Sequence, residues 1–151
     1  MYDGPVFKFL SHLLTLNSIL LRKTQGLMLY DEALALHAAK KYKEAVPLMR
    51  QAAELGNPNA MGILGSMYLL GQGVPENGAI ALEWLEKAVS AGGVGSSSVL
   101  GMALATGKAG VKPDITRARE LLTKAAQDGD AQSAEMLGMM DARKGMFRNL
   151  R

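Results

Sequence analysis

A short motif rich in small residues returns along the chain, and this internal repeat limits the possible folds more than any other feature. Residues 52–56, Ala-Ala-Glu-Leu-Gly, are followed after 36 and then 37 residues by related segments at 88–92 and 125–129. Units of this length cannot bury an apolar face alone, and they stack on their neighbours instead. The sequence therefore predicts a solenoid of stacked repeats. A Leu-Gly pair recurs at the same intervals, as Leu64-Gly65, Leu100-Gly101 and Leu137-Gly138.

Each repeat is expected to fold into two helices joined by a short loop. The first helix of a repeat ends at a glycine, Gly71 or Gly107, and a proline shortly afterwards, Pro75 or Pro113, prevents the helix from continuing. Apolar residues then recur at helical spacing through the second helix. First helices are predicted at 59–70 and 96–106, second helices at 79–91 and 115–128, a more degenerate pair at 28–40 and 42–55, and a lone first helix at 131–142.

Small residues within the predicted helices indicate close contacts between them. Gly65 and Gly101 lie in the middle of first helices, where a glycine costs about 1 kcal/mol relative to alanine. We expect the recurring alanines of the second helices, Ala45, Ala81 and Ala118, to face these glycines. A large residue three positions after each alanine is predicted to fill the space beside the contact. These large residues are Leu48, Trp84 and Leu121.

The composition favours an all-α fold and argues against a nucleic-acid groove. Of the 151 residues, 48% are hydrophobic and only 5% are aromatic, which suits closely packed helices. The net charge of +3 belongs to the two ends, because residues 1–26 carry +2, residues 27–140 carry −2 and residues 141–151 carry +3. Phosphate binding needs Lys and Arg clustered on one face, so no nucleic-acid partner is expected.

Residues 5–24 do not match the repeat, and they predict an amphipathic helix with a wide apolar face and a basic polar face. We expect a separate element at residues 1–26, a repeat domain at 27–142 and a basic tail at 143–151. The helix has three interpretations: a cap on the first repeat, a docking helix for a partner or a second copy, or a helix on a membrane surface. Asn17 within its apolar face would fix the register of a pairing.

Few residues are suited to catalysis or metal binding. The chain has no cysteine, and its two histidines, His12 and His37, stand in no metal-ligand spacing. The glycine-rich segments 92–95 and 107–110 lack the Gly-Lys-Ser/Thr ending of a phosphate-binding loop. The three serines at 96–98 open a predicted helix, so hydroxyl capping is expected there. The sequence therefore predicts a protein that is not an enzyme, with no catalytic residue, metal or cofactor.

The ordered motifs resemble the Sel1-like (Sel-one-like) repeats, a family related to the tetratricopeptide repeats. The resemblance covers about residues 42–140, and residues 60–92 keep the pattern best, with Leu-Gly, a tyrosine, a Gly-x-Gly-Val loop, Ala-x-x-Trp and Lys-Ala-x-x-x-Gly. The next copy departs from it, with Leu104 in place of Tyr68 and Leu121 in place of Trp84. The resemblance implies a short right-handed α-solenoid of antiparallel helix hairpins, here with an extra N-terminal helix.

Solenoids of this kind recognise proteins or peptides on a concave surface lined by first helices. The resemblance implies a non-catalytic adaptor or regulator in bacterial signalling, secretion or toxin immunity. The alternative is a self-assembling subunit that pairs through the N-terminal helix or the open C-terminal half repeat. We expect a protein or peptide partner, or a homo-oligomer, in the cytoplasm or, after removal of a signal peptide, in the periplasm. The predicted binding face comprises Asn59, Gly62, Ser66, Leu69, Leu70, Ser98, Met102, Ala105, Thr106, Glu135 and Met139.

Overall fold

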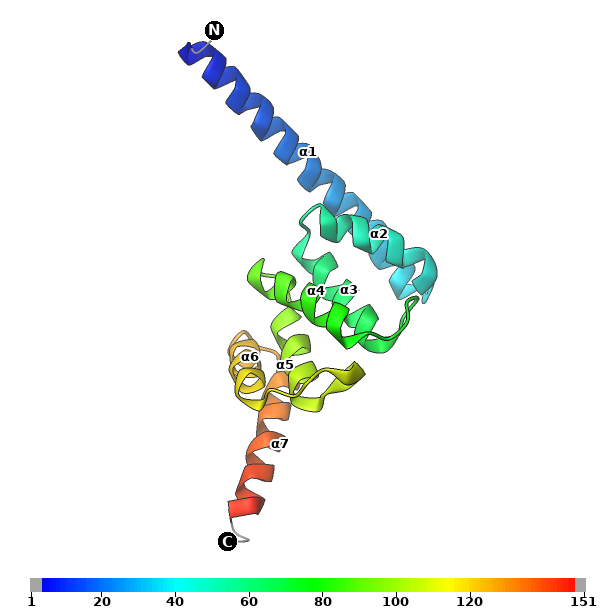
Figure 1. Ribbon diagram of the computed structural model, residues 1–151, viewed down its shortest axis with the longest axis vertical. Coiled ribbons are helices and arrows are strands. Elements are labelled where there is room, and N and C mark those ends of the chain that lie inside the picture. The colour runs from blue at the N-terminus through cyan, green and yellow to red at the C-terminus, as the bar shows by residue number, and fades with distance from the viewer. Residues whose placement is uncertain (1–3, 149–151) are drawn as a thin grey trace.

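The structure is a computed structural model that describes residues 4–148, with side chains up to residue 143, and this part of the chain is all-helical. Its elements are α1 (Pro5–Ala38), α2 (Tyr42–Glu54), α3 (Pro58–Leu70), α4 (Gly78–Ser90), α5 (Ser96–Thr106), the 3-10 turn η1 (Lys108–Gly110), α6 (Ile115–Gln127) and α7 (Ala131–Arg148). The pairs α1–α2, α3–α4 and α5–α6 form hairpins. The hairpins stack in chain order into an α-solenoid, which confirms the predicted fold class (Figure 1).

Helix α1 is longer than the sequence suggested and spans 34 residues. It continues through residue 26, where we expected a boundary, because Gly26 is tolerated within the helix and packs closely on the end of α2. A Cβ atom on Gly26 would lie 3.3 Å from the Cβ atom of Leu55. Residues 4–25 are exposed throughout and project away from the repeats (Figure 1). The interpretation of this segment as a cap on the first repeat is therefore wrong.

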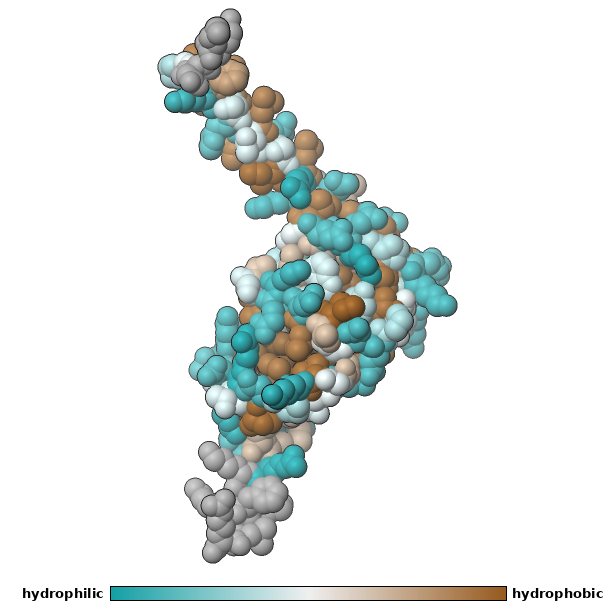
Figure 2. All heavy atoms as spheres, in the orientation of Figure 1, coloured by the Kyte–Doolittle hydropathy of each residue, from teal (hydrophilic) through white to brown (hydrophobic). Residues whose placement is uncertain are grey.

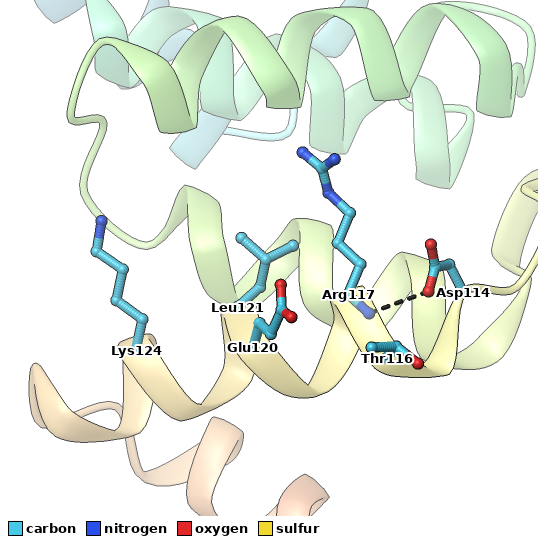
Figure 3. Close-up of a pocket in the computed structure, with 6 residues that line it drawn as sticks. All are labelled: Asp114, Thr116, Arg117, Glu120, Leu121 and Lys124. Carbon is cyan, nitrogen blue, oxygen red and sulfur yellow. Dashed lines mark hydrogen bonds between the residues drawn. The ribbon is translucent and has the colours of Figure 1, made fainter.

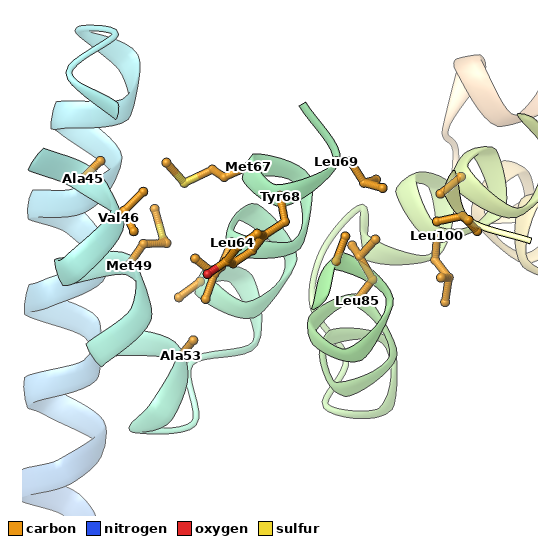
Figure 4. Packing of buried hydrophobic residues seen from close by; sticks show 14 of the residues in the cluster. Ala45, Val46, Met49, Ala53, Leu64, Met67, Tyr68, Leu69, Leu85 and Leu100 are labelled. Carbon is orange, nitrogen blue, oxygen red and sulfur yellow. The ribbon is translucent and has the colours of Figure 1, made fainter. Parts of the chain in front are cut away.

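The buried core runs along the solenoid from one hairpin to the next (Figure 4). In the α3–α4 and α5–α6 hairpins the two helices are in close contact at a glycine, as predicted. A Cβ atom on Gly65 would lie only 3.1 Å from the carbonyl oxygen of Ala81 and 2.7 Å from Cγ of Leu85. Any side chain at this position would push the two helices apart. The equivalent residues of the next hairpin are Gly101, Ala118 and Leu122.

The large side chain that fills each close contact lies one position later in the sequence than predicted. Leu85 and Leu122 are fully buried, whereas Trp84 and Leu121 are only partly buried at the edge of the core. Neighbouring positions on a helix differ in direction by about 100°, so only the residue four places after the alanine points at the glycine. Trp84 instead lies against the Lys87 ammonium group, which is 4.6 Å from the ring centroid.

The described part of the solenoid ends on a half repeat. Helix α7 packs on α6 and α5, and no second helix follows it within residues 4–148. Gly138 is the counterpart of Gly65 and Gly101, yet a Cβ atom added to it would meet nothing within 4 Å. The tail that we expected at residues 143–151 is helical up to Arg148, and residues 149–151 lie outside the described residues.

Candidate functional site

Successive repeats join where each new first helix begins, and three equivalent positions shape each of these junctions. One position lies on the earlier first helix, one at the cap of the later helix, and one in the first turn of that helix. The repeat intervals identify Gly26, Asn57 and Ala60 at the α1–α3 junction, Gly62, Gly93 and Ser96 at the α3–α5 junction, and Ser98, Asp130 and Ser133 at the α5–α7 junction.

A hydrogen-bonded cluster closes the α5–α7 junction. Oδ2 of Asp130 accepts hydrogen bonds from the Ser133 amide at 2.7 Å and from Ser98 Oγ at 2.8 Å. Ser133 Oγ donates to Ser98 Oγ at 2.9 Å, and both serines are buried. Hydrogen bonds from the Ser133 and Ser98 side chains and from the Ser133 amide favour the ionised carboxylate, so they lower the pKa of Asp130 below its ordinary value. Ser98 therefore serves the junction between repeats.

The α3–α5 junction lacks this cluster, because glycine occupies two of its three positions. Gly93 has no side chain with which to cap α5, and α5 begins only at Ser96 without a side-chain cap. Asn59 of α3 partly compensates, since its Oδ1 atom accepts a hydrogen bond from the Val94 amide at 3.0 Å. Ser96 Oγ is buried and has no hydrogen-bond partner in the described part of the chain. The prediction that the serines at 96–98 cap this helix is therefore wrong.

The late start of α5 is accompanied by a groove over the first helices, which we call the first-helix groove. Its volume is about 390 Å³. Val94 is 86% exposed and lies at the rim, whereas Ser96 is 1% exposed and lies at the floor. The groove thus combines apolar side chains with hydroxyl and amide groups, and none of its lining residues is charged. They are Tyr30, Asn59, Gly62, Ile63, Ser66, Val94, Gly95, Ser96 and Val99.

The structure brings together only part of the predicted binding face. Asn59, Gly62 and Ser66 line the first-helix groove. Leu69 and Ser98 are 5% and 4% exposed, so their assignment to an exposed face is wrong. Leu69 packs in the core, and Ser98 is held by Asp130. The other predicted residues lie outside the groove, with Met102 and Ala105 partly exposed and Leu70, Thr106, Glu135 and Met139 exposed.

Sequence reasoning missed several residues that line the groove. Tyr30 belongs to α1, whose repeat pattern is too degenerate to align by eye. Ile63 and Val99 are apolar, and the pattern does not distinguish them from core residues. Val94 stands in a predicted turn, and its place at the rim follows from the late start of α5. The signal that could have revealed the groove is the glycine at position 93, where the equivalent positions hold capping residues, Asn57 and Asp130.

Other polar clusters on the described surface have structural roles. Within the described residues, no three His, Cys, Asp or Glu side chains are grouped closely enough to hold a metal ion. A hollow of about 370 Å³ lies along α6 (Figure 3). There Asp114 Oδ1 caps the helix by accepting a hydrogen bond from the Arg117 amide. The Arg117 guanidinium reaches Glu86 of α4 at 2.6 Å. These contacts fix the start of α6 and link it to α4.

The arrangement defines an α-solenoid of antiparallel helical hairpins, a class of protein that presents elongated surfaces for binding. The Sel1 repeat profile matches residues 26–57, 58–93 and 98–130. The chain belongs to the Sel1 repeat family, as its motifs indicated. Sel1 repeats are generally protein–protein interaction modules, and the proteins that carry them are generally non-catalytic scaffolds.

Solved structures with the same fold cover most of this chain. The Sel1 repeat protein from Oxalobacter formigenes is 27% identical, with a TM-score of 0.67 over 76% of this chain and 47% of that chain. A protective antigen of uropathogenic Escherichia coli strains, which displays an SLR fold, is 31% identical, with a TM-score of 0.72 over 79% of this chain and 26% of that chain. Cysteine rich protein B of Helicobacter pylori shares the fold at 24% identity, with a TM-score of 0.54 over 62% and 69% of the two chains.

A curated relative matches one part of the sequence more closely. An uncharacterised protein of Neisseria meningitidis serogroup B is 43% identical over 58 residues, which are 36% of this chain and 12% of the relative. The chain thus spans only a small part of that relative, and less than half of either Sel1-type structure from Oxalobacter and Escherichia. In the part of the chain that the structure describes, no helix combines the length and the apolar character needed to cross a membrane.

Proposed function

We propose that the chain is a non-catalytic adaptor whose first-helix groove binds a short uncharged segment of a partner protein. Its family supports protein binding in general, and the α3–α5 junction supports this location. The observation that carries the proposal is the uncharged lining of the groove, where the exposed Val94 side chain lies beside the polar side chains of Asn59 and Ser66.

The chemistry of the lining suits an extended peptide. Asn59 uses Oδ1 to accept from the Val94 amide, and the same side chain carries an NH₂ group that can donate to a peptide carbonyl. Ser66 Oγ donates to the Gly62 carbonyl at 3.0 Å, and its oxygen can still accept from a peptide amide. Exposed Val94 offers apolar contact beside these groups. A charged side chain would lose its hydration here without gaining a partner, so the bound segment should be uncharged.

A displayed library of random linear peptides can supply the probe for this site. Peptides selected on the immobilised chain would be synthesised with a fluorophore, and their Kd measured by fluorescence anisotropy. Ser66→Arg fills the groove with a long charged side chain, so it should weaken binding by about tenfold or more. Circular dichroism melting curves should show that the variant folds like the wild type.

Ser90→Arg is the matched control for this experiment. It makes the same substitution at an exposed position in the last turn of α4, outside the groove. We expect its Kd for the selected peptides to equal that of the wild type. Selected peptides that bind the wild type, Ser66→Arg and Ser90→Arg equally well would place the binding site elsewhere on the molecule.

A further inference from the structure

The N-terminal half of α1 carries a long apolar surface that nothing in the described chain covers. Twelve large apolar side chains between Val6 and Met28 are 44–71% exposed. Brown, hydrophobic side chains are visible along the face of the projecting helix that Figure 2 shows. At about 150 Å² for each large side chain, the twelve side chains present roughly 1,000 Å². This exceeds the roughly 800 Å² that each partner contributes to a standard protein interface, and it is larger than the patches usual on monomers.

Most of this apolar surface faces away from the repeats. The two buried residues of α1, Gly26 and Ala33, mark the side of the helix that packs on the rest of the chain. With 3.6 residues per turn, Val6, Leu13 and Leu20 lie on the opposite half of the helix. The repeats of the same chain therefore cannot cover these residues while α1 stays helical. A helix that covers them must come from outside the described residues.

The spacing of the apolar residues fits pairing with another helix. Positions that alternate by four and three residues form a coiled-coil seam, and most positions of this seam are leucine. Asn17 lies at its centre, where an amide needs a polar partner at the same level of the interface. In a parallel pair of identical helices, that partner is Asn17 of the second copy. The seam comprises Val6, Leu10, Leu13, Asn17, Leu20, Thr24 and Leu27.

The geometry points to parallel, in-register pairing of two copies of this chain through the seam. An anionic membrane surface fits this helix less well. Asp31 and Glu32 follow the seam on the same outward side of α1 and would lie against the headgroups. Lys8 and Arg22 lie on the other side, where they would point away from a bilayer. Pairing is independent of the first-helix groove, to which α1 contributes only Tyr30.

Light scattering coupled to size-exclusion chromatography tests the pairing over a range of chain concentrations. The wild type should reach twice the chain mass of 16.1 kDa. The double variant Leu13→Lys/Leu20→Lys places charges in the seam, so it should remain at the mass of one chain. Both leucines are exposed, so the variant should melt like the wild type. A wild type that stays monomeric throughout, or a double variant that associates equally well, would overturn the proposal.

The matched control places the same charges on the polar face of the helix. Ser11→Lys/Thr15→Lys should associate like the wild type, because both positions are exposed on the side opposite the seam. Loss of association in this control as well would show that added charge acts without regard to the seam, and would overturn the assignment. Binding of the selected peptides can be measured on every variant. The proposal of pairing through the seam can therefore be refuted without affecting the proposal of peptide binding in the groove, and the reverse also holds.

Cross-linking tests the parallel register. The natural chain contains no cysteine, so Asn17→Cys introduces a single thiol at the centre of the seam. Mild oxidation should give a disulfide-linked pair of this variant, whereas Thr15→Cys on the far side should stay unlinked. Equal linkage of both variants would contradict the register. A monomeric wild type that sediments with vesicles of phosphatidylcholine and phosphatidylserine would replace pairing with membrane binding.

Discussion

The α5–α7 and α3–α5 junctions have different chemistry at equivalent positions. At the α5–α7 junction, two buried serine hydroxyls and the Asp130 carboxylate bond to one another, and the carboxylate caps the later helix. At the α3–α5 junction, Gly62 and Gly93 leave room for the Ser96 hydroxyl. A Cβ atom on Gly62 or on Gly93 would lie 2.6 Å or 2.7 Å, respectively, from Ser96 Oγ. Hydrogen bonds thus close one junction, and close packing forms the other.

The two junctions differ at one cap position, which sets where the later helix begins. Asn57 and Asp130 accept hydrogen bonds from the first turns of α3 and α7, and those helices begin at the next residue. Gly93 cannot do so, and α5 begins later, beside the first-helix groove. A capping side chain is worth about 1 kcal/mol. The α3–α5 junction lacks that stabilisation, and it is the junction beside which we propose that a partner segment binds.

The largest expected effect comes from transferring the cap of one junction to the other. Gly93→Asp supplies the missing cap, but its Cβ atom would lie 2.7 Å from the Pro58 carbonyl oxygen and 2.7 Å from Ser96 Oγ. The overpacking should lower the free energy of unfolding by about 1–3 kcal/mol or more, beyond what the cap returns. Urea denaturation would measure the loss, and Gly93→Ala separates the packing effect from the carboxylate. A stabilised Gly93→Asp variant would show that the two junctions are interchangeable.

A smaller contrast comes from the same substitution at equivalent positions. Ser133→Ala removes a hydroxyl that donates to Ser98, so it should lower the free energy of unfolding by about 1 kcal/mol. Ser96→Ala removes a buried hydroxyl that has no partner, so it should leave stability unchanged or raise it. The helix propensities change equally in both variants and cancel in the comparison. Equal losses in urea denaturation would mean that Ser96 is paired after all.

The smallest expected effect is a dependence on pH at the α5–α7 junction. The pKa of Asp130 is lower in the folded state than in the unfolded state. At pH values above the ordinary aspartate pKa of about 3.9, the ionised carboxylate therefore stabilises the fold. This contribution is lost as the pH falls through the lower pKa of the folded state. Asp130→Asn keeps an acceptor for the cap but cannot titrate. The stability of the wild type relative to Asp130→Asn should therefore decrease between pH 7 and about 3.

The control for this titration is Asp128→Asn, which removes an exposed charge two residues away and outside the hydrogen-bonded cluster. The free energy of unfolding of the wild type should exceed that of Asp130→Asn at pH 7, and this difference should shrink on acidification. The corresponding difference between the wild type and Asp128→Asn should change less. Urea denaturation midpoints measured at each pH would give both differences in stability. Parallel curves for the two variants would show that the cluster does not hold the Asp130 carboxylate in the folded state.

The helix pairs and their close contacts could be predicted because the residues that repeat are the residues that pack. Gly65 and Gly101 recur at the repeat interval, and each contacts the alanine that the pattern assigned to it. Continuity of α1 could not be predicted from the repeat, because the apolar face of its N-terminal half lies opposite the side that packs on the repeats. The absence of an internal proline between residues 6 and 38 was the available signal.

The binding face was only partly predictable, because exposure of a helical position depends on what the next repeat places against it. Ser66 lines the groove, whereas Ser98, a small polar residue of the following first helix, is buried beneath Asp130. The two serines look alike in the sequence. What separates them is a residue that follows Ser98 by 32 positions. A pattern read within one repeat does not contain that information.

The unbroken course of α1 has a consequence for avidity. Val6 of the seam and Tyr30 of the groove lie on one rigid helix, about 36 Å apart at 1.5 Å per residue. In a paired assembly, the two grooves would therefore be held at a set separation. A partner with two suitable segments at that spacing would bind its second groove at a high effective concentration, whereas a partner with a mismatched spacing would gain nothing from the second site.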